Sequence, residues 1–229
     1  MPIYVPTEGT ESWRRLLADP VKHWAEDHSA MAVAQSWEAA RGLPPEITAL
    51  LAQSFDAPEL LAAFPEHQVH LDTRKRPSQN DVFAIVRDQT RTIAMAVEGK
   101  VKEPFGDTVA AWLQGDSGSR QARLHFLRSK LGLETHDLGD VRYQLLHRTA
   151  SAMIEAERFR TDAAAMVVQS FAANDMWLED FQRFVALFGD HGVVPTGRLV
   201  RIDLKPRPLF LGWAKGDARF LNDLSRLSS

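Results

Sequence analysis

The chain has no cysteine among its 229 residues, which excludes disulfide bonds and thiolate metal sites. No apolar run approaches the roughly 18 residues that a membrane span needs. The N-terminus has polar breaks where a signal peptide needs a basic start and an apolar stretch. We therefore expect a cytoplasmic protein with no membrane partner. The eight histidines show no zinc-ligand spacing, so we expect no structural zinc site.

Basic residues are also in no large excess. The formal charge is −3, and residues 1–68 hold four basic against ten acidic side chains. The remaining 161 residues hold 23 basic against 20 acidic side chains. A strongly basic nucleic-acid-binding chain would show more, so composition counts against tight nonspecific DNA binding but leaves a local patch open. The sequence also lacks a phosphate-binding glycine loop, a nucleophile elbow and a paired-histidine metal motif, which disfavours a small-molecule enzyme of an unrelated α/β fold.

Apolar periodicity predicts a helical N-terminal third, then three strands, then alternating helices and strands. Length and a hydrophobic content of 45% favour one domain over residues 1–229. Helices are expected at 11–18, 26–41, 45–55, 57–64, 107–113, 119–131, 140–158, 177–188 and 217–227. Strands are expected at 69–71, 82–86, 92–97, 163–171, 199–204 and 208–213.

The strands at 82–86 and 92–97 flank a short polar connection, which predicts a β-hairpin. Asp81 opens the first strand and Glu98 closes the second, so antiparallel pairing brings both carboxylates to the same end of the hairpin. Lys100 lies two residues beyond Glu98, and the strand period of two puts both side chains on one face. The sequence therefore predicts that an Asp, a Glu and a Lys converge on one point.

These three residue types suit metal-assisted cleavage of a phosphodiester. Mg²⁺ prefers hard oxygen ligands and is usually held by one or two carboxylates together with a substrate phosphate. Asp81 and Glu98 would supply those ligands, with Mn²⁺ as a substitute metal. An ammonium such as Lys100 can orient or help deprotonate the attacking water and can stabilise the charge of the transition state. The alternative interpretation of Glu98 and Lys100 is a solvated charge pair on a strand edge.

With the order helix, three strands, helix, strand, residues 26–171 resemble the PD-(D/E)XK nuclease superfamily, the restriction-endonuclease-like fold. Glu98-Gly99-Lys100 matches the (D/E)XK element, and Asp81, seventeen residues before Glu98, matches the first acid. Asn80 precedes this acid, where the family name has Pro. The string Val-Glu-Gly-Lys-Val-Lys-Glu-Pro-Phe-Gly further suggests a bacterial subgroup for which no activity is implied.

The resemblance implies an α/β (α+β) fold with a central mixed β-sheet flanked by helices, preceded by extra N-terminal helices. The remaining residues, 172–229, would form a C-terminal extension, which we expect to continue the core sheet. An acid on the first core helix joins the site in many members, and Glu38 is the matching candidate, with Glu46 in reserve. The backbone carbonyl of Gly99 would be a further metal ligand.

Two more groups of residues are candidates for binding the substrate. In exonuclease-like members a glutamine on the second core helix is followed four residues later by tyrosine; here Gln144 is present, but Arg148 stands at the tyrosine position, which favours an endonuclease. Gln144 and His147 share a helix face with Arg148, and they either point into the cleft or satisfy buried neighbours. The basic run Arg74-Lys75-Arg76 is placed to hold a phosphate backbone, with a solvated charge run as the alternative.

The function implied by the resemblance is Mg²⁺-dependent hydrolysis of DNA, by an enzyme that often acts as a homodimer. The alternative is a noncatalytic nucleic-acid-binding or protein-interaction module on the same scaffold, because a fold does not fix a function. The neutral-to-acidic charge favours this module, whereas the intact set of Asp81, Glu98 and Lys100 opposes it.

Overall fold

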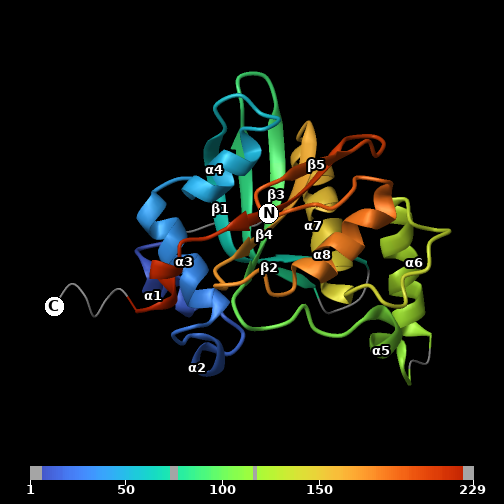
Figure 1. Cartoon of the computed structure of the whole chain (residues 1–229), viewed down its shortest axis with the longest axis horizontal. Helices are drawn as coiled ribbons and strands as arrows, with labels where there is room; N and C mark the ends of the chain where they lie inside the picture. The colour runs from blue at the N-terminus through green and yellow to red at the C-terminus, as the bar shows by residue number, and fades with distance from the viewer. Residues whose placement is uncertain (1–6, 73–76, 116–117, 224–229) are drawn as a thin grey trace.

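A computed structural model describes residues 7–72, 77–115 and 118–223. One six-stranded mixed β-sheet with helices on both faces organises these residues, so the chain is a mixed α/β protein (Figure 1). The strands are β1 (Glu59–Val69), β2 (Ser78–Arg87), β3 (Thr92–Lys100), β4 (Ala163–Ser170), β5 (Leu199–Ile202) and β6 (Leu209–Lys215). The α-helices are α1 (Thr10–Arg14), α2 (Pro20–His23), α3 (Ser29–Ala40), α4 (Pro45–Leu51), α5 (Val109–Leu113), α6 (Ser119–Leu131), α7 (Tyr143–Phe159) and α8 (Leu178–Val185). Two 3₁₀ helices, η1 (Ala186–Phe188) and η2 (Ala218–Leu221), complete them.

The strand order in the sheet is β1-β2-β3-β4-β6-β5. β1, β2 and β3 form an antiparallel meander, and β4 lies parallel to both β3 and β6. A parallel neighbour requires a crossover connection, which the helices α5 to α7 provide between β3 and β4. β5 and β6 continue the sheet beyond β4, so the late strands extend the sheet as we expected.

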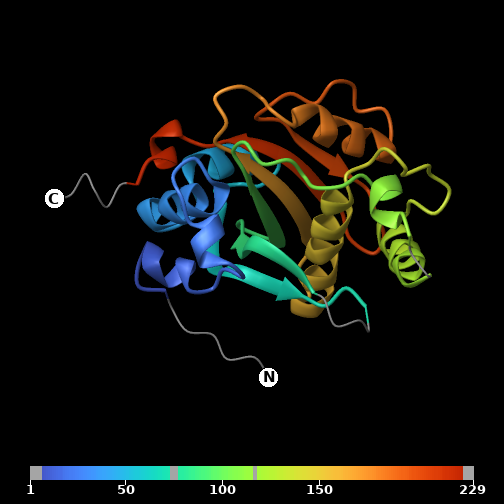
Figure 2. The same ribbon diagram turned by 90° about the horizontal axis from the view of Figure 1, so that it is seen from below.

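Two apolar cores lie on opposite faces of the sheet, and the side-chain alternation of β3 shows which residues belong to each. Ile93, Met95 and Val97 face the core formed with the N-terminal helices α3 and α4. Ala94 and Ala96 face the core formed with α6, α7 and α8. Figure 2 shows the N-terminal helices on one side of the sheet and α7 on the other. None of the helices in the described ranges is long and apolar enough to cross a membrane.

The predicted helix at 57–64 is wrong, because this segment belongs to the edge strand β1. Its Leu and Ala residues are good helix formers, but pairing with β2 from Glu59 to Val69 overrides that local preference. The strand predicted at 69–71 is therefore only the end of a longer strand. A register shift between Leu60 and Ala62 interrupts the pairing near its start.

Two helix ends also differ from the predictions. The helix expected at 107–113 begins later: Thr108 is the N-cap of α5, and its hydroxyl accepts a hydrogen bond from the backbone N–H of Ala111 at 3.3 Å. Of the helix expected at 217–227, the structure has the 3₁₀ turn η2, while residues 224–229 lie outside the described residues. The helix predicted at 119–131 is confirmed as α6, the other predicted helices and strands are present with shifted ends, and the short helix α2 was not predicted.

Candidate active site

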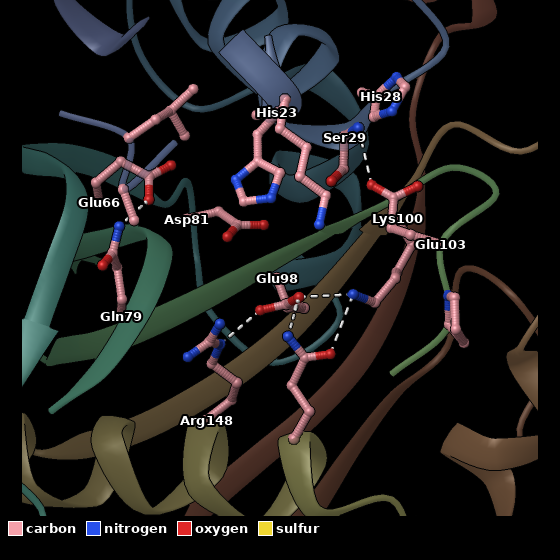
Figure 3. A pocket seen from close by; sticks show the side chains of 16 residues that line it. His23, His28, Ser29, Glu66, Gln79, Asp81, Glu98, Lys100, Glu103 and Arg148 are labelled. Atoms are coloured by element: carbon pink, nitrogen blue, oxygen red, sulfur yellow. Dashed lines mark hydrogen bonds and ion pairs between the residues drawn. The ribbon is translucent and has the colours of Figure 1, made fainter. Parts of the chain in front are cut away.

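The β2–β3 hairpin brings Asp81 and Glu98 to one end of the sheet. Val82 pairs with Val97, so the adjoining positions across the two strands are Asp81 and Glu98. Both line one cavity of about 480 Å³ together with Lys100 (Figure 3). The sequence-predicted convergence of these three residues is therefore found in the structure.

Glu98 is 3% exposed, and both of its carboxylate oxygens accept hydrogen bonds from charged or polar groups. The Lys100 Nζ and the Gln144 Nε2 each donate to Oε1 at 2.7 Å. The Arg148 Nε donates to Oε2 at 2.5 Å. Burial alone would raise the pKa of Glu98, but the charges of Arg148 and Lys100 outweigh it and lower the pKa to about 2. Glu98 is therefore ionised at neutral pH.

Lys100 is held as firmly as its partner. Its side chain is also 3% exposed, and besides Glu98 it contacts Gln144, whose Oε1 accepts from the Nζ at 3.2 Å. The ammonium lies 4.8 Å from the centre of the Phe105 ring, a cation–π distance. The lysine is thus positioned by groups from β3, α7 and the segment that follows β3.

Asp81 has a different environment. Its Oδ2 accepts a hydrogen bond from the backbone N–H of Gly99 at 2.7 Å. Burial raises the pKa of Asp81 well above its ordinary value, and the negative charges of Glu98 and Glu66 add to the increase. The position beside it requires glycine, because a Cβ on Gly99 would lie 2.5 Å from the Cγ2 of Val33 on α3.

A third carboxylate extends the row onto β1. Pro65 pairs with Val82, so Glu66 occupies the position next to Asp81. Glu66 has a left-handed backbone with φ 52°, and its Oε2 accepts a hydrogen bond from the Gln79 Nε2 at 2.7 Å. Burial raises the pKa of Glu66 to about 7 despite that hydrogen bond. This residue is protonated in part at neutral pH.

The N-terminal helices supply the opposite wall of the cavity. In Figure 3 the ring of His23 projects into the cavity above Asp81, and His28 and Ser29 lie beside it. The backbone N–H of Ser29, at the start of α3, donates to the Glu103 Oε1 at 2.9 Å. The cavity is therefore lined by α2, α3 and α7, with the carboxylates along its sheet side.

The other predicted site residues are distributed unevenly. Gln144 lines the cavity, but Glu38 does not, contrary to the expectation from the sequence. The Oε1 of Glu38 accepts from the Trp13 indole N–H at 2.7 Å and from the Thr7 hydroxyl at 3.0 Å, so Glu38 joins α3 to α1. Glu46, the reserve candidate, accepts from the Gln169 Nε2 at 2.6 Å, also away from this cavity.

Of the candidate substrate-binding residues, Arg74, Lys75 and Arg76 lie outside the described residues. His147 does not line the carboxylate cavity; its Nδ1 is 2.8 Å from the Ser78 hydroxyl, and it borders a neighbouring cavity.

Sequence reasoning missed Glu66 and Gln79, and for Arg148 it gave only a helix face that either points into the cleft or satisfies buried neighbours. The spacing of Arg148 four residues after Gln144 placed both on one helix face, which was the available signal. No local pattern pointed to Glu66, because the segment before it was expected to be a helix and its contact with Asp81 depends on strand pairing.

The oxygen donors of the cavity fit a hard divalent cation. Within the ranges that the structure describes, no group of three or more His, Cys, Asp or Glu side chains is arranged to hold a metal ion. Mg²⁺ is, however, usually held by one or two carboxylates plus substrate phosphate and water. Asp81 in particular gains from a nearby cation, because burial and two neighbouring carboxylates disfavour its ionised form.

The fold and site define a mixed α/β protein with a buried acid–lysine cluster at one end of its sheet. Comparison with known families assigns it more closely: the chain belongs to the family described as a domain of unknown function (DUF6946), whose model matches residues 6–218. Searches of curated proteins and of solved structures find no match.

Proposed function

We propose that this protein is a Mg²⁺-dependent deoxyribonuclease with a restriction-endonuclease-like core. The chain order α3, β1, β2, β3, α7, β4, with these four strands in one mixed sheet, supports this fold. The activity is supported chiefly by one observation, that Asp81, Glu98 and Lys100 line the same cavity at the end of the β2–β3 hairpin. Two acids and an ammonium at one point suit the hydrolysis of a phosphodiester.

In this proposal Asp81, Glu98 and the backbone carbonyl of Gly99 hold the Mg²⁺, and Mn²⁺ can replace it. When bound, the ion polarises a phosphoryl oxygen and lowers the pKa of water. The low pKa of Glu98 supports its part, because this carboxylate needs no deprotonation before it binds a cation. The raised pKa of Asp81 supports a site that gains from positive charge.

The proposed roles of the two fixed cations follow from their contacts with Glu98. Lys100 stands beside the attacking water and stabilises the negative charge that develops on the phosphate, while Glu98 and Gln144 hold its ammonium in position. Arg148 keeps Glu98 ionised and oriented through the bond to Oε2. On the opposite wall, Lys22 and His23 offer positive or polar groups to the DNA backbone.

The test combines metal binding with cleavage. The wild-type protein, Asp81→Asn and Glu98→Gln are titrated with Mn²⁺ by calorimetry and then assayed on supercoiled DNA and labelled oligonucleotides with Mg²⁺. We expect both variants to lose metal binding and to lose about 100-fold or more of the cleavage rate.

Glu59→Gln is the matched control, since Glu59 lies on the same sheet but pairs with Arg87 near the opposite end of the hairpin. It should cleave like the wild type, and because all variants pass through the same purification, a loss of cleavage confined to Asp81→Asn and Glu98→Gln excludes a contaminating nuclease. Metal-dependent cleavage that persists undiminished in folded Glu98→Gln protein would refute the proposed activity.

One observation favours a noncatalytic module instead. Both oxygens of Glu98 already accept hydrogen bonds from Lys100, Gln144 and Arg148, so a metal has to compete with two cations for this carboxylate. In that case the cluster would stabilise a binding scaffold, and the wild type would show neither millimolar metal binding nor cleavage while still binding its ligand.

A further inference from the structure

A second cavity borders the carboxylate cavity. Its volume is about 360 Å³, and the two cavities share Pro104, Gln144 and Arg148 on their walls. The remaining wall includes Trp112 of α5 and Tyr143 of α7, whose rings stack with their centroids 3.8 Å apart and 12° between their planes. An aromatic cavity is thus separated from the acid cluster by single side chains.

Polar groups in this second cavity can meet the edge of a flat ligand. His147 contributes an imidazole whose Nδ1 is fixed 2.8 Å from the Ser78 hydroxyl. Burial and the charge of Arg148 lower the pKa of His147 well below its ordinary value, so the ring is neutral and has both a donor and an acceptor nitrogen. The carboxylate of Asp107 adds an acceptor.

Two arginine side chains contact backbone carbonyls of this cavity's wall. The Arg142 Nη1 donates to the Gly106 carbonyl at 2.8 Å, and its Nε donates to the Asp180 Oδ2 at 2.9 Å. The Arg120 Nη1 donates to the carbonyl of Trp112, and its guanidinium lies 5.8 Å from the centre of the Trp112 ring. Flat apolar walls, polar groups for an edge and a guanidinium beside an aromatic ring are elements that recognise single-stranded nucleic acid.

We propose that the second cavity binds an unpaired base of single-stranded DNA, adjacent to the phosphate that enters the carboxylate cavity. This inference rests on the proposed nuclease function, because that function places the neighbouring phosphate in the carboxylate cavity. The strand then crosses Gln144 and Arg148, which the two cavities share. The base packs against the Trp112–Tyr143 pair, and its edge meets His147. A paired base cannot enter without leaving its stack, so the cavity selects single-stranded or locally opened DNA.

The test measures binding without cleavage. Fluorescence anisotropy in EDTA compares a labelled single strand of about 15 nucleotides with the duplex of the same sequence. We expect Trp112→Ala to weaken single-strand binding by about 5- to 150-fold, the range for one stacked base, and to leave the weaker duplex binding unchanged. Trp112→Phe should restore most of the loss, because phenylalanine keeps a stacking face.

The matched control is Phe126→Ala, which removes an aromatic ring from a separate cavity of about 310 Å³ that also contains Lys130. Its single-strand affinity should equal that of the wild type. A second measurement needs no variant: wild-type protein is titrated with strands that carry one abasic site at successive positions. One position should lose affinity by a factor similar to that of Trp112→Ala.

The outcomes separate this inference from the proposed activity. Equal affinity of Trp112→Ala and wild type, no sensitivity to any abasic site, or a preference for duplex would each overturn the base site, even if the protein cleaves DNA. Trp112-dependent binding of single strands by a protein that never cleaves would leave the base site standing and reject the nuclease.

Discussion

The two ends of the β2–β3 hairpin each carry an aspartate, and their surroundings affect them in opposite ways. At the turn, Asp88 is 8% exposed, and its Oδ1 accepts from the backbone N–H groups of Thr90 at 2.9 Å and Arg91 at 2.7 Å. Burial would raise its pKa, but these bonds and the Arg91 guanidinium lower it to about 2. At the other end, burial and two neighbouring carboxylates raise the pKa of Asp81.

This difference indicates which of the two aspartates stabilises the fold. Asp88 takes its donors from its own turn, so its ionised form stabilises the hairpin. Asp81 instead lies beside Glu66 and Glu98 in a cavity, where the ionised form gains little from the protein itself. Strongly perturbed acids in a cavity are candidates for function, because folding alone does not explain their placement.

The largest effect on stability is expected at Glu98, which resembles Asp88 because both of its carboxylate oxygens accept hydrogen bonds. Arg148→Leu leaves Glu98 buried with less compensation, which should reduce the free energy of unfolding by about 3–5 kcal/mol. Urea denaturation at pH 7 measures the loss. Arg87→Leu, which breaks the exposed pair with Glu59, is the control and should cost under about 1 kcal/mol. Equal costs would mean that the Glu98 cluster is not a buried ion pair in solution.

The next prediction compares the two aspartates directly. Asp88→Asn should lower the free energy of unfolding by about 2 kcal/mol, because it weakens several charge-assisted hydrogen bonds. Asp81→Asn should lower it by less than Asp88→Asn does, or raise it, because asparagine keeps an acceptor oxygen for the Gly99 N–H and removes a charge that burial and two carboxylates disfavour. Thermal denaturation at pH 7 distinguishes them.

The pH dependence of this pair has opposite signs. The pKa of Asp88 is lower in the folded protein, so its contribution is complete above the unfolded value of about 4 and is lost as the pH falls toward 2. The pKa of Asp81 is higher in the folded protein, so the fold loses stability as the pH rises above the unfolded-state aspartate pKa of about 4. A larger loss for Asp81→Asn than for Asp88→Asn at pH 7 would contradict the comparison.

The same contrast explains what could be predicted from the sequence. Asp81, Glu98 and Lys100 were found because a hairpin and a strand period of two are local features. Arg148 binds a residue 50 positions away, so its helix spacing gave only its face. Glu66 was missed because a helix-favouring segment became an edge strand through pairing with β2. Glu38 was misplaced because helix periodicity cannot tell which neighbour a side chain meets.

Glu66 provides a smaller effect that tests the carboxylate row. Its folded pKa of about 7 lies above the unfolded value, so the protein should lose stability as the pH rises from about 4.5 through 7. Glu66→Gln should remove this loss. The free energy of unfolding of the variant relative to the wild type should therefore rise by about 1 kcal/mol between pH 5 and pH 8, after allowance for solvent screening. Urea midpoints at the two pH values measure it. Identical pH profiles for variant and wild type would show that Glu66 titrates as an ordinary exposed acid.

The smallest effect concerns Glu38, which belongs with Asp88 because its oxygen accepts hydrogen bonds from Trp13 and Thr7. Glu38→Gln keeps an acceptor oxygen but removes the charge, so the free energy of unfolding should fall by only about 0.5–1 kcal/mol. Calorimetric Mn²⁺ binding and oligonucleotide affinity should match those of the wild type, since Glu38 lies outside the carboxylate cavity. Loss of Mn²⁺ binding in this variant would place Glu38 with Asp81 among the acids that act in the cavity, and the hydrogen bonds from Trp13 and Thr7 would then no longer indicate a purely structural role.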